Sequence, residues 1–448
     1  MRKTLIILFF FGGSVLAQAP DSGEYQFTLQ QAISHALEHN YSILNATRDV
    51  QAAEKTRWET AAIGLPQINA GIDYTNNIEI PLSVIPAQFF DTDAPPGTFT
   101  PVAFSPKQSA TARATLSQLI FDGSYIVALQ ASKVYLDFYK NYKQKANNEI
   151  RTEVVTAYGN ALLADESIRI LEQNKTSLEK TLHETSEIFE NGLIEEENVE
   201  QLQITLTSIN SSLKNVLRLR DISYNFLKLS LGIDLSNTLK LTDKLENLTT
   251  ENLKWSLTES EFDVSQNIDF KISQNFSEQR RLELAREKSR ALPSLFANLT
   301  YGANTFNNDF EFLKSTNPWF DFAVLGVSLQ VPVFSSLART ARTQKAKIAL
   351  EQAKTQLTET EQRLKLAYQN ARSNYEFSVE EYATSKSNLQ LAERIQNKQQ
   401  IKFSEGLSSS FDFSDAQRQL YAAQQAFLQS MVNVIRNKAQ LESIINSN

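Results

Sequence analysis

The chain has 448 residues, no cysteine and a formal net charge of −7 at pH 7. The absence of cysteine excludes disulfides, thiol catalysis and Cys-ligated metals, and the mild negative charge argues against nucleic-acid binding, which needs a basic surface. The length would allow two or three ordinary domains, but an internal duplication, described below, favours one intertwined body.

The N-terminus has the pattern of a secretory signal peptide. Arg2 and Lys3 form the charged start, Leu5 to Phe11 form a short apolar run, and small residues follow at a cleavage site. We expect a signal peptide over residues 1–17, with residue 19 as the alternative end, and export of the mature protein. The apolar run is too short to span a bilayer, and no later stretch supplies 18 consecutive apolar residues, so no transmembrane helix is predicted.

The two halves of the chain repeat one plan. Asn40 is followed 26 residues later by Pro66, and Asn267 is followed 26 residues later by Pro293, each proline in a Leu-Pro pair. Each half predicts a helix, a Leu-Pro break, paired strands, a long helix, a Gly-Leu turn and a second long helix. The predicted organisation is a first repeat over 18–231, a connector over 232–262 and a second repeat over 263–448.

Long helices are predicted where proline is missing. No proline lies in the tracts 107–292 and 333–448, so most of each tract is free to be helical. Apolar residues recur there at an interval of seven, and the last helix carries the clearest row: Phe413, Leu420, Phe427, Val434 and Leu441. A sustained interval of seven predicts left-handed coiled-coil packing.

Four shorter segments have a period of two instead, at about 66–76, 109–121, 293–305 and 320–333. Each is about as long as a tilted strand that crosses a bilayer. Aromatic residues near the loop-side ends predict an interfacial girdle: Tyr74, Tyr301, Trp319, Phe320 and Phe322.

A soluble sheet with one face on a core would give the same alternation. The secretory signal and the absence of cysteine favour the membrane barrel. Four strands cannot close around a lumen, and about eight is the practical minimum, so several chains must contribute to one barrel.

One motif points to different chemistry. His35 and His39 stand in the H-x-x-E-H spacing of inverted zinc peptidases, and histidines four apart share a helix face. The only other histidine, His183, falls inside a predicted long coiled coil, so no third ligand is indicated. We expect no catalytic site, no metal site and no cofactor, and no enzyme.

The signal, the duplicated plan and the Gly-Leu turns together resemble the TolC-like outer-membrane efflux factor family. The resemblance covers essentially all of the mature chain. Its most specific pieces are Leu29-x-x-Ala32-x-x-x-Ala36-Leu37-x-x-Asn40, the two Leu-Pro junctions and residues 406–416.

The resemblance implies a mainly α-helical protein with β-strands. Three chains would contribute four strands each to a twelve-stranded transmembrane β-barrel in the outer membrane. Below the barrel would stand a tunnel of long antiparallel α-helical coiled coils in the periplasm. Residues near 233–262 and the chain ends would form a mixed equatorial collar.

In that family two aspartates after the second Gly turn line the closed periplasmic aperture, which implies this role for Asp412 and Asp415. Their spacing puts both carboxylates on one helix face. A trimer would bring together six carboxylates, able to hold cations and to oppose anions. The alternative is that both only favour the first turn of a helix capped by Ser409 or Ser410, and the two roles can coexist.

The resemblance also implies that the two turns contact the adaptor protein. The residues concerned are Gly192, Leu193, Gly406, Leu407, Ser408 and Ser409. The plain alternative is two helix-to-helix turns that use glycine because it tolerates a positive φ.

We therefore expect an outer-membrane channel of a Gram-negative bacterium, the exit duct of a tripartite efflux or secretion system. Its expected partners are two further copies of itself, a periplasmic adaptor (membrane fusion) protein, an inner-membrane transporter and outer-membrane lipid, with no nucleic acid. The alternative is a helical structural or adhesive surface protein without a channel, which would have no use for four segments with lipid-facing alternation.

Overall fold

The computed structural model describes residues 23–253, 262–314 and 316–445, so the expected signal peptide lies outside the described residues. The chain divides into two compact units. The helical unit takes its residues from the ranges 1–45, 144–267 and 363–448, and the sheet unit from 46–143 and 268–362. None of the described helices has the length and apolar character that a bilayer-spanning helix needs.

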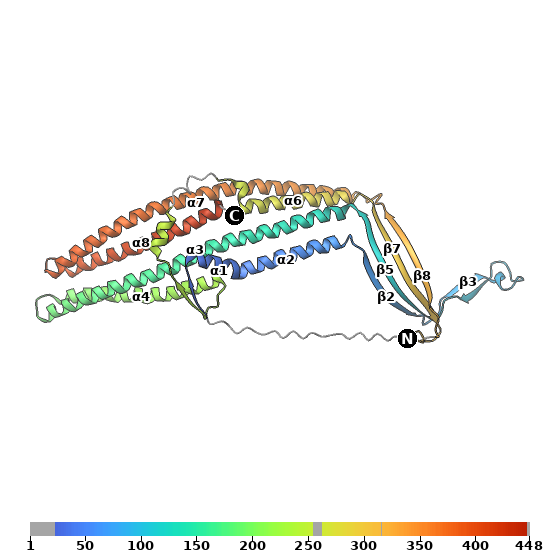
Figure 1. Ribbon diagram of the computed structural model, residues 1–448, viewed down its shortest axis with the longest axis horizontal. Helices are drawn as coiled ribbons and strands as arrows, with labels where there is room; N and C mark the ends of the chain where they lie inside the picture. Colours follow the sequence, from blue (N-terminus) through green and yellow to red (C-terminus); the bar gives the residue numbers. More distant parts are fainter. Residues whose placement is uncertain (1–22, 254–261, 315, 446–448) are drawn as a thin grey trace. The chain divides into compact units, whose positions relative to one another are not determined.

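The sheet unit contains the four strands that the period-two pattern predicts. They form one antiparallel sheet in the order β2-β5-β7-β8, side by side in Figure 1. Their bounds are β2 Gln67–Asn76, β5 Gln108–Asp122, β7 Ser294–Asn307 and β8 Phe320–Gln330.

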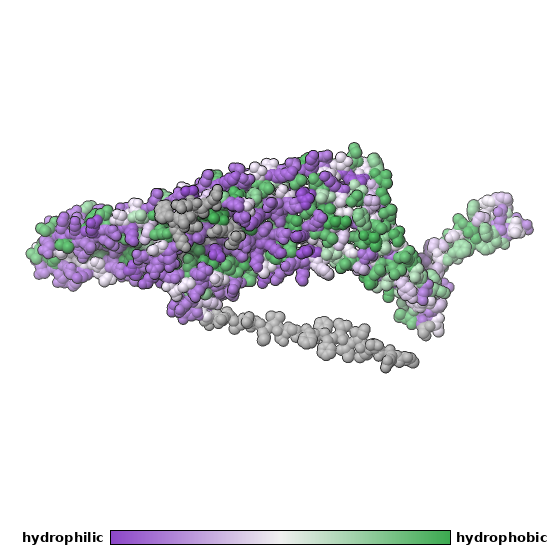
Figure 2. Space-filling view, turned by 45° about the horizontal axis from the view of Figure 1, so that its top comes forward, coloured by the Kyte–Doolittle hydropathy of each residue, from purple (hydrophilic) through white to green (hydrophobic). Residues whose placement is uncertain are grey.

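One face of this sheet, the apolar face, carries aliphatic residues in cross-strand rows. One row joins Ile68, Leu116, Leu299 and Leu325 across all four strands. Ile68 and Leu325 are both 72% exposed in the isolated chain, and Figure 2 shows hydrophobic side chains gathered over the strands. A β-bulge between Leu119 and Phe121 in β5 shifts the register by one residue, because an extra residue on one strand changes which side chains oppose each other.

The opposite face, the Arg113 face, is held by polar contacts between strands. Arg113 pairs with Asp73 at 2.9 Å, the Thr115 and Thr300 hydroxyls lie 3.0 Å apart, and Thr111 donates to Asn304 at 2.8 Å; these contacts join β2, β5 and β7.

The expected aromatic girdle is wrong for two of its members. The register pairs Phe322 with Gly302 and Phe320 with Asn304, on the Arg113 face, whereas Tyr301 pairs with Ala323 on the apolar face. Side chains alternate between the two faces of a strand, so even-numbered β8 residues cannot share a face with Ala323.

The loop between β2 and β5 contains a hairpin that was not predicted from the sequence, because residues 77–109 include six prolines. Strand β3 (Leu82–Pro86) pairs with β4 (Phe99–Ala103), and the short 3₁₀ helix η1 (Ala87–Phe89) follows β3. Proline is tolerated in such a two-stranded ribbon because each strand has a free edge.

The sheet unit also contains most of α2 (Tyr41–Ala62) and α6 (Ile268–Ser289), which lead into β2 and β7. After α2 the chain turns at Gly64, whose carbonyl accepts a bond from Gln118 Nε2 at 2.8 Å. The Leu-Pro pair then starts the strand, because the residue before a proline avoids helical backbone angles.

The helical unit is built from helices that pack along apolar rows. Phe413, Leu420, Val434 and Leu441 of the predicted row are buried. The helix bounds are α1 Leu29–His39, α3 Gly123–Glu190, α4 Glu196–Leu231, α7 Ala338–Ser404 and α8 Ser410–Ile445, of which α3 and α7 begin in the sheet unit.

A small mixed element completes this unit. Strand β1 (Glu24–Phe27) runs parallel to β6 (Thr238–Leu241), and α5 (Leu245–Asn252) and the 3₁₀ helix η3 (Val264–Gln266) follow. The Tyr158 hydroxyl of α3 lies 2.9 Å from the Phe27 carbonyl and 3.0 Å from Asp243 Oδ2, which also accepts the Leu29 N–H at 2.7 Å. Burial, with the nearby Asp243 charge, raises the pKa of Tyr158, so the tyrosine stays a neutral donor.

Candidate functional site

The first helical tip is the turn between α3 and α4. Gly192 adopts a φ of 73°, its N–H donates to the Phe189 carbonyl at 2.8 Å, and the Leu193 N–H donates to the Ile188 carbonyl at 3.2 Å. This pair of bonds is a Schellman motif, which satisfies the last carbonyls of a helix. A Cβ on Gly192 would meet no atom within 4 Å, so only the backbone angle requires glycine.

The second tip, between α7 and α8, repeats this geometry. Gly406 has a φ of 71°, its N–H donates to the Phe403 carbonyl at 3.0 Å, and the Leu407 N–H donates to the Lys402 carbonyl at 2.7 Å. Leu193 and Leu407 hold the same place in the two turns and are 75% and 78% exposed. Each tip therefore presents one leucine to its surroundings from a rigid turn.

Asp412 belongs to a capping box at the start of α8, the helix that follows the second tip. The Asp412 N–H donates to Ser409 Oγ at 3.1 Å, and the Ser409 hydroxyl and N–H both donate to Asp412 Oδ2, at 2.8 and 3.4 Å. This reciprocal arrangement is a capping box, so Ser409 rather than Ser410 is the capping residue. The Ser409 hydroxyl is the largest cause that lowers the pKa of Asp412 below its ordinary value.

Asp415, one turn further along α8, has a different environment. Arg418 donates to Asp415 Oδ1 at 2.8 Å and Gln419 donates to Oδ2 at 2.7 Å. The carboxylate is thus ion-paired while remaining partly exposed. Asp412, Asp415 and Arg418 together contribute two negative charges and one positive charge in each chain, a net of −1.

The two tips contact each other within the helical unit. The Ser410 N–H lies 3.4 Å from Asn198 Oδ1, and both residues stand at the start of the second helix of their hairpin. Phe413, 1% exposed, is part of the apolar cluster that joins both hairpins. The other buried members of this cluster are Leu171, Leu178, Leu202 and Ile209.

Sequence analysis missed Arg418 and the contact between Asn198 and Ser410. Asp415 and Arg418 are three residues apart, a spacing at which side chains on a helix interact. Their ion pair could therefore have been predicted. The contact between Asn198 and Ser410 joins residues 212 positions apart, and no local sequence pattern predicts such a contact.

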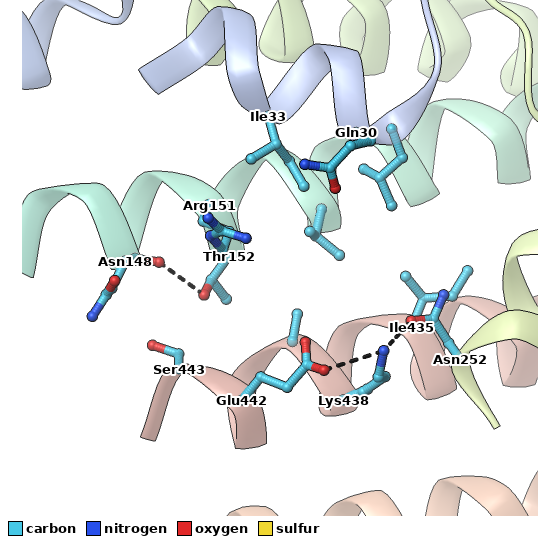
Figure 3. A pocket seen from close by; sticks show the side chains of 13 residues that line it. Gln30, Ile33, Asn148, Arg151, Thr152, Asn252, Ile435, Lys438, Glu442 and Ser443 are labelled. Carbon is cyan, nitrogen blue, oxygen red and sulfur yellow. Dashed lines mark hydrogen bonds and ion pairs between the residues drawn. The ribbon is translucent and has the colours of Figure 1, made fainter. Parts of the chain in front are cut away.

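A pocket of about 470 Å³ lies between α1, α3 and α8 (Figure 3). Lys438, 8% exposed, donates to Asn252 Oδ1 at 2.8 Å and pairs with Glu442 at 3.2 Å. This buried cation is thus neutralised and hydrogen-bonded, as a buried charge requires. Lys438 links α8 to the end of α5 and serves the stability of the helical unit.

The histidines of the H-x-x-E-H motif stack on each other. The rings of His35 and His39 lie 4.2 Å apart and nearly parallel, and His39 Nδ1 lies 3.1 Å from the His35 carbonyl. Burial, then the neighbouring His39, lowers the pKa of His35. Across the part of the chain that the structure describes, no three His, Cys, Asp or Glu side chains are grouped to hold a metal ion.

A four-stranded antiparallel sheet with one apolar face, together with long helical hairpins that end in tight turns, defines the class of outer-membrane channel subunits. The chain belongs to the outer membrane efflux protein family, whose model matches residues 32–233 and 276–447. The match in two halves agrees with the internal duplication. No curated protein matches the sequence.

Solved structures share the fold at low sequence identity. The outer membrane protein VceC from Vibrio cholerae has a TM-score of 0.71 at 16% identity, covering 93% of this chain and 96% of VceC. The Campylobacter jejuni CmeC outer membrane channel has a TM-score of 0.74 at 17% identity, covering 94% and 85%. The open state of the Neisseria gonorrhoeae MtrE outer membrane channel has a TM-score of 0.70 at 16% identity, covering 93% and 88%.

The protein is therefore a TolC-like outer-membrane efflux channel of a Gram-negative bacterium and not an enzyme. Family membership implies trimeric assembly within a tripartite efflux system.

Proposed function

We propose that this channel is the passive exit duct for an inner-membrane transporter, joined to it by a periplasmic adaptor (membrane fusion) protein. The chain contains no Gly-rich phosphate-binding loop, so the energy for transport comes from the transporter. The observation that carries the proposal is the pair of equivalent tips, each a Schellman turn with an exposed leucine.

The adaptor contacts these tips. We assign the contact to Gly192, Leu193, Gly406, Leu407, Ser408 and Ser409. An exposed apolar side chain on a rigid turn favours association because it loses little conformational entropy on binding. Six tips in a trimer, two from each chain, would also make the attachment multivalent.

Periplasmic cross-linking to co-expressed adaptor tests this assignment. Leu193→Asp with Leu407→Asp should abolish the cross-linked complex while the trimer still assembles. Ile204→Asp is the matched control, because Ile204 is a 65% exposed apolar residue on α4 away from the turn. Equal cross-linking by the double variant and the control would refute the tip assignment.

Asp412 and Asp415 line the periplasmic aperture in this proposal. The trimer places six carboxylates and three Arg418 guanidinium groups around the opening, which leaves a negative ring that holds cations. Opening separates the tip helices, so the Asn198–Ser410 contact at 3.4 Å would have to break.

Single-channel recordings in planar bilayers test the aperture. Asp412→Ala with Asp415→Ala should raise the conductance and remove block by a trivalent cation, and Arg418→Gln should strengthen the block because it removes the positive charge. Unchanged conductance and unchanged block in the aspartate variant would rule out the aperture role.

The same proposal covers the organisation of the chain. We assign residues 1–17, or 1–19, to a signal peptide, 18–231 and 263–448 to the two repeats, and 232–262 to an equatorial connector. The β1–β6 pairing, which joins a chain end to the connector, supports the collar. Outer-membrane lipid would contact the apolar face of the sheet.

A further inference from the structure

The Arg113 face of the sheet is polar over most of its extent but aromatic near the loop-side end. Phe306 at the end of β7 and Phe320 at the start of β8 have ring centroids 6.3 Å apart. They are 47% and 56% exposed in the chain, and the register puts both on the face of Arg113. The described residues of this face therefore include an aromatic patch that no neighbouring side chain covers fully.

Arg113 and Phe322 lie in one cross-strand row of this patch. The row joins Gly71, Arg113, Gly302 and Phe322. A Cβ on Gly302 would lie 2.8 Å from Phe322 Cζ, so the phenylalanine ring occupies the space that a side chain would fill. The missing side chain lets the ring lean across β7 toward the strand of Arg113.

Arg113 keeps hydrogen-bonding capacity in this position. One of its terminal nitrogens pairs with Asp73 at 2.9 Å, and the Arg113 side chain is 51% exposed. A guanidinium has five N–H donors, so a second anionic group can bind without breaking the Asp73 pair. Arg113 is the only lysine or arginine within the four strands of the sheet.

The Arg113 face must line the channel lumen. The opposite face carries Ile72, 79% exposed, and Leu325, 72% exposed, as a lipid-facing surface does. A charged pair at the middle of a strand is costly in lipid, so Arg113 and Asp73 point to the water-filled side. Three chains then surround the lumen with three copies of the Arg113 face.

We propose that Phe306, Phe320, Phe322, Arg113 and Asp73, the lumen band, form a cargo-contact site for amphiphilic molecules that combine an aromatic ring with an anionic group. The ring packs on the phenylalanines in an offset or edge-to-face arrangement, and the anionic group accepts bonds from Arg113. Such binding is weak and open to the lumen, as passage through a channel requires. The proposal rests on the channel function and adds a preference for cargo.

Relative permeability in planar bilayers tests the band. The probes are benzenesulfonate and ethanesulfonate, two anions with the same charged group. The measured quantity is the permeability of benzenesulfonate divided by that of ethanesulfonate, obtained from reversal potentials. Phe320→Ser with Phe322→Ser should lower the ratio about threefold to tenfold, the equivalent of one aromatic contact. Arg113→Gln should lower the permeability of both anions.

Phe89→Ser is the matched control, because Phe89 is an 81% exposed phenylalanine of η1 outside the sheet. An unchanged ratio in the double serine variant, or an equal fall in Phe89→Ser, would overturn the proposal. If the double variant does not assemble, Phe322→Leu keeps the apolar volume and still removes the ring, and the same ratio decides.

Two cysteine variants test which face lines the lumen, since the chain has no cysteine of its own. A membrane-impermeant maleimide should label Phe322→Cys and should not label Leu325→Cys in proteoliposomes, and the reverse pattern would overturn the band. An absence of any current through the wild-type protein would contradict the channel function itself. A current that does not discriminate between benzenesulfonate and ethanesulfonate would contradict only the proposed role of the lumen band.

Discussion

Asn40 and Asn267 make the same contact in the two repeats. Asn40 Nδ2 donates to the Ser230 carbonyl at 2.8 Å, and Asn267 Nδ2 donates to the Ile444 carbonyl at 3.0 Å. The acceptors lie in the last turns of α4 and α8, where carbonyls lack partners within the helix. The internal duplication is thus visible in individual hydrogen bonds as well as in the order of elements.

Removal of either asparagine side chain should therefore destabilise the helical unit. Asn40 and Asn267 are 5% and 3% exposed. Asn40→Ala leaves the buried Ser230 carbonyl without this donor, and Asn267→Ala does the same to the partly buried Ile444 carbonyl, each at a cost of about 1–3 kcal/mol in the free energy of unfolding. Denaturant unfolding of the purified protein measures this. Asn160→Ala, at an exposed position of α3, is the control, and losses no larger than in the control would contradict the expectation.

Glycines with similar backbone angles should tolerate alanine differently. Gly192 and Gly232 have φ of 73° and 75°, and alanine costs about 1–2 kcal/mol from that conformation alone. A Cβ on Gly232 would also lie 2.3 Å from the His39 carbonyl oxygen, whereas Gly192 has open space. Gly232→Ala should lower the melting temperature clearly more than Gly192→Ala, and equal shifts would show that the overlap is relieved at no cost.

His35 should make stability depend on pH. Its pKa is lowered in the folded protein, first by burial and then by His39, so the unfolded chain binds the proton more tightly. Stability is then highest above the ordinary histidine value of 6.5 and falls as pH decreases below it. Melting temperatures at pH 7.5 and 5.5 should differ more for the wild type than for His35→Phe, and an equal difference would exclude His35 as the source.

The capping box should keep Asp412 charged in mild acid. Because the Ser409 hydroxyl lowers the Asp412 pKa, the carboxylate contributes stability above its ordinary value of 3.8 and loses it only as pH falls through the lower folded value. If Asp412 lines the aperture, block by a trivalent cation should persist to lower pH in the wild type than in Ser409→Ala. A pH titration of single-channel current measures this, and coincident titrations would contradict it.

Lys438 should contribute to stability through its two partners. Lys438→Met leaves Asn252 Oδ1 without its donor and Glu442 without its partner, at a cost of about 1–3 kcal/mol. Glu442→Gln should cost less, because Glu442 is partly exposed and the amide can still accept a bond. Equal losses in the two variants would indicate that the ion pair, rather than the Asn252 contact, carries the effect.

Much of the architecture follows from local patterns. The row of sevens in α8 predicted the buried Phe413 and Leu441, and both tip glycines adopt the positive φ that their turns need. The β3–β4 hairpin was not predicted, because proline-rich segments are typical of irregular loops. The sequence could not decide whether Ser409 or Ser410 is the helix cap, since serine suits a cap at either position.

The amino-acid sequence by itself determined the elements of this protein: four strands, long paired helices, glycine turns and their duplication. These depend on periodicity and backbone preferences within a few residues. Only the tertiary structure decided that Phe322 lies in a row with Arg113 and that the Ser410 N–H lies within 3.4 Å of Asn198 Oδ1. Strand register and helix packing bring together residues hundreds of positions apart, and a pattern local to one segment carries no information about which distant segment will face it.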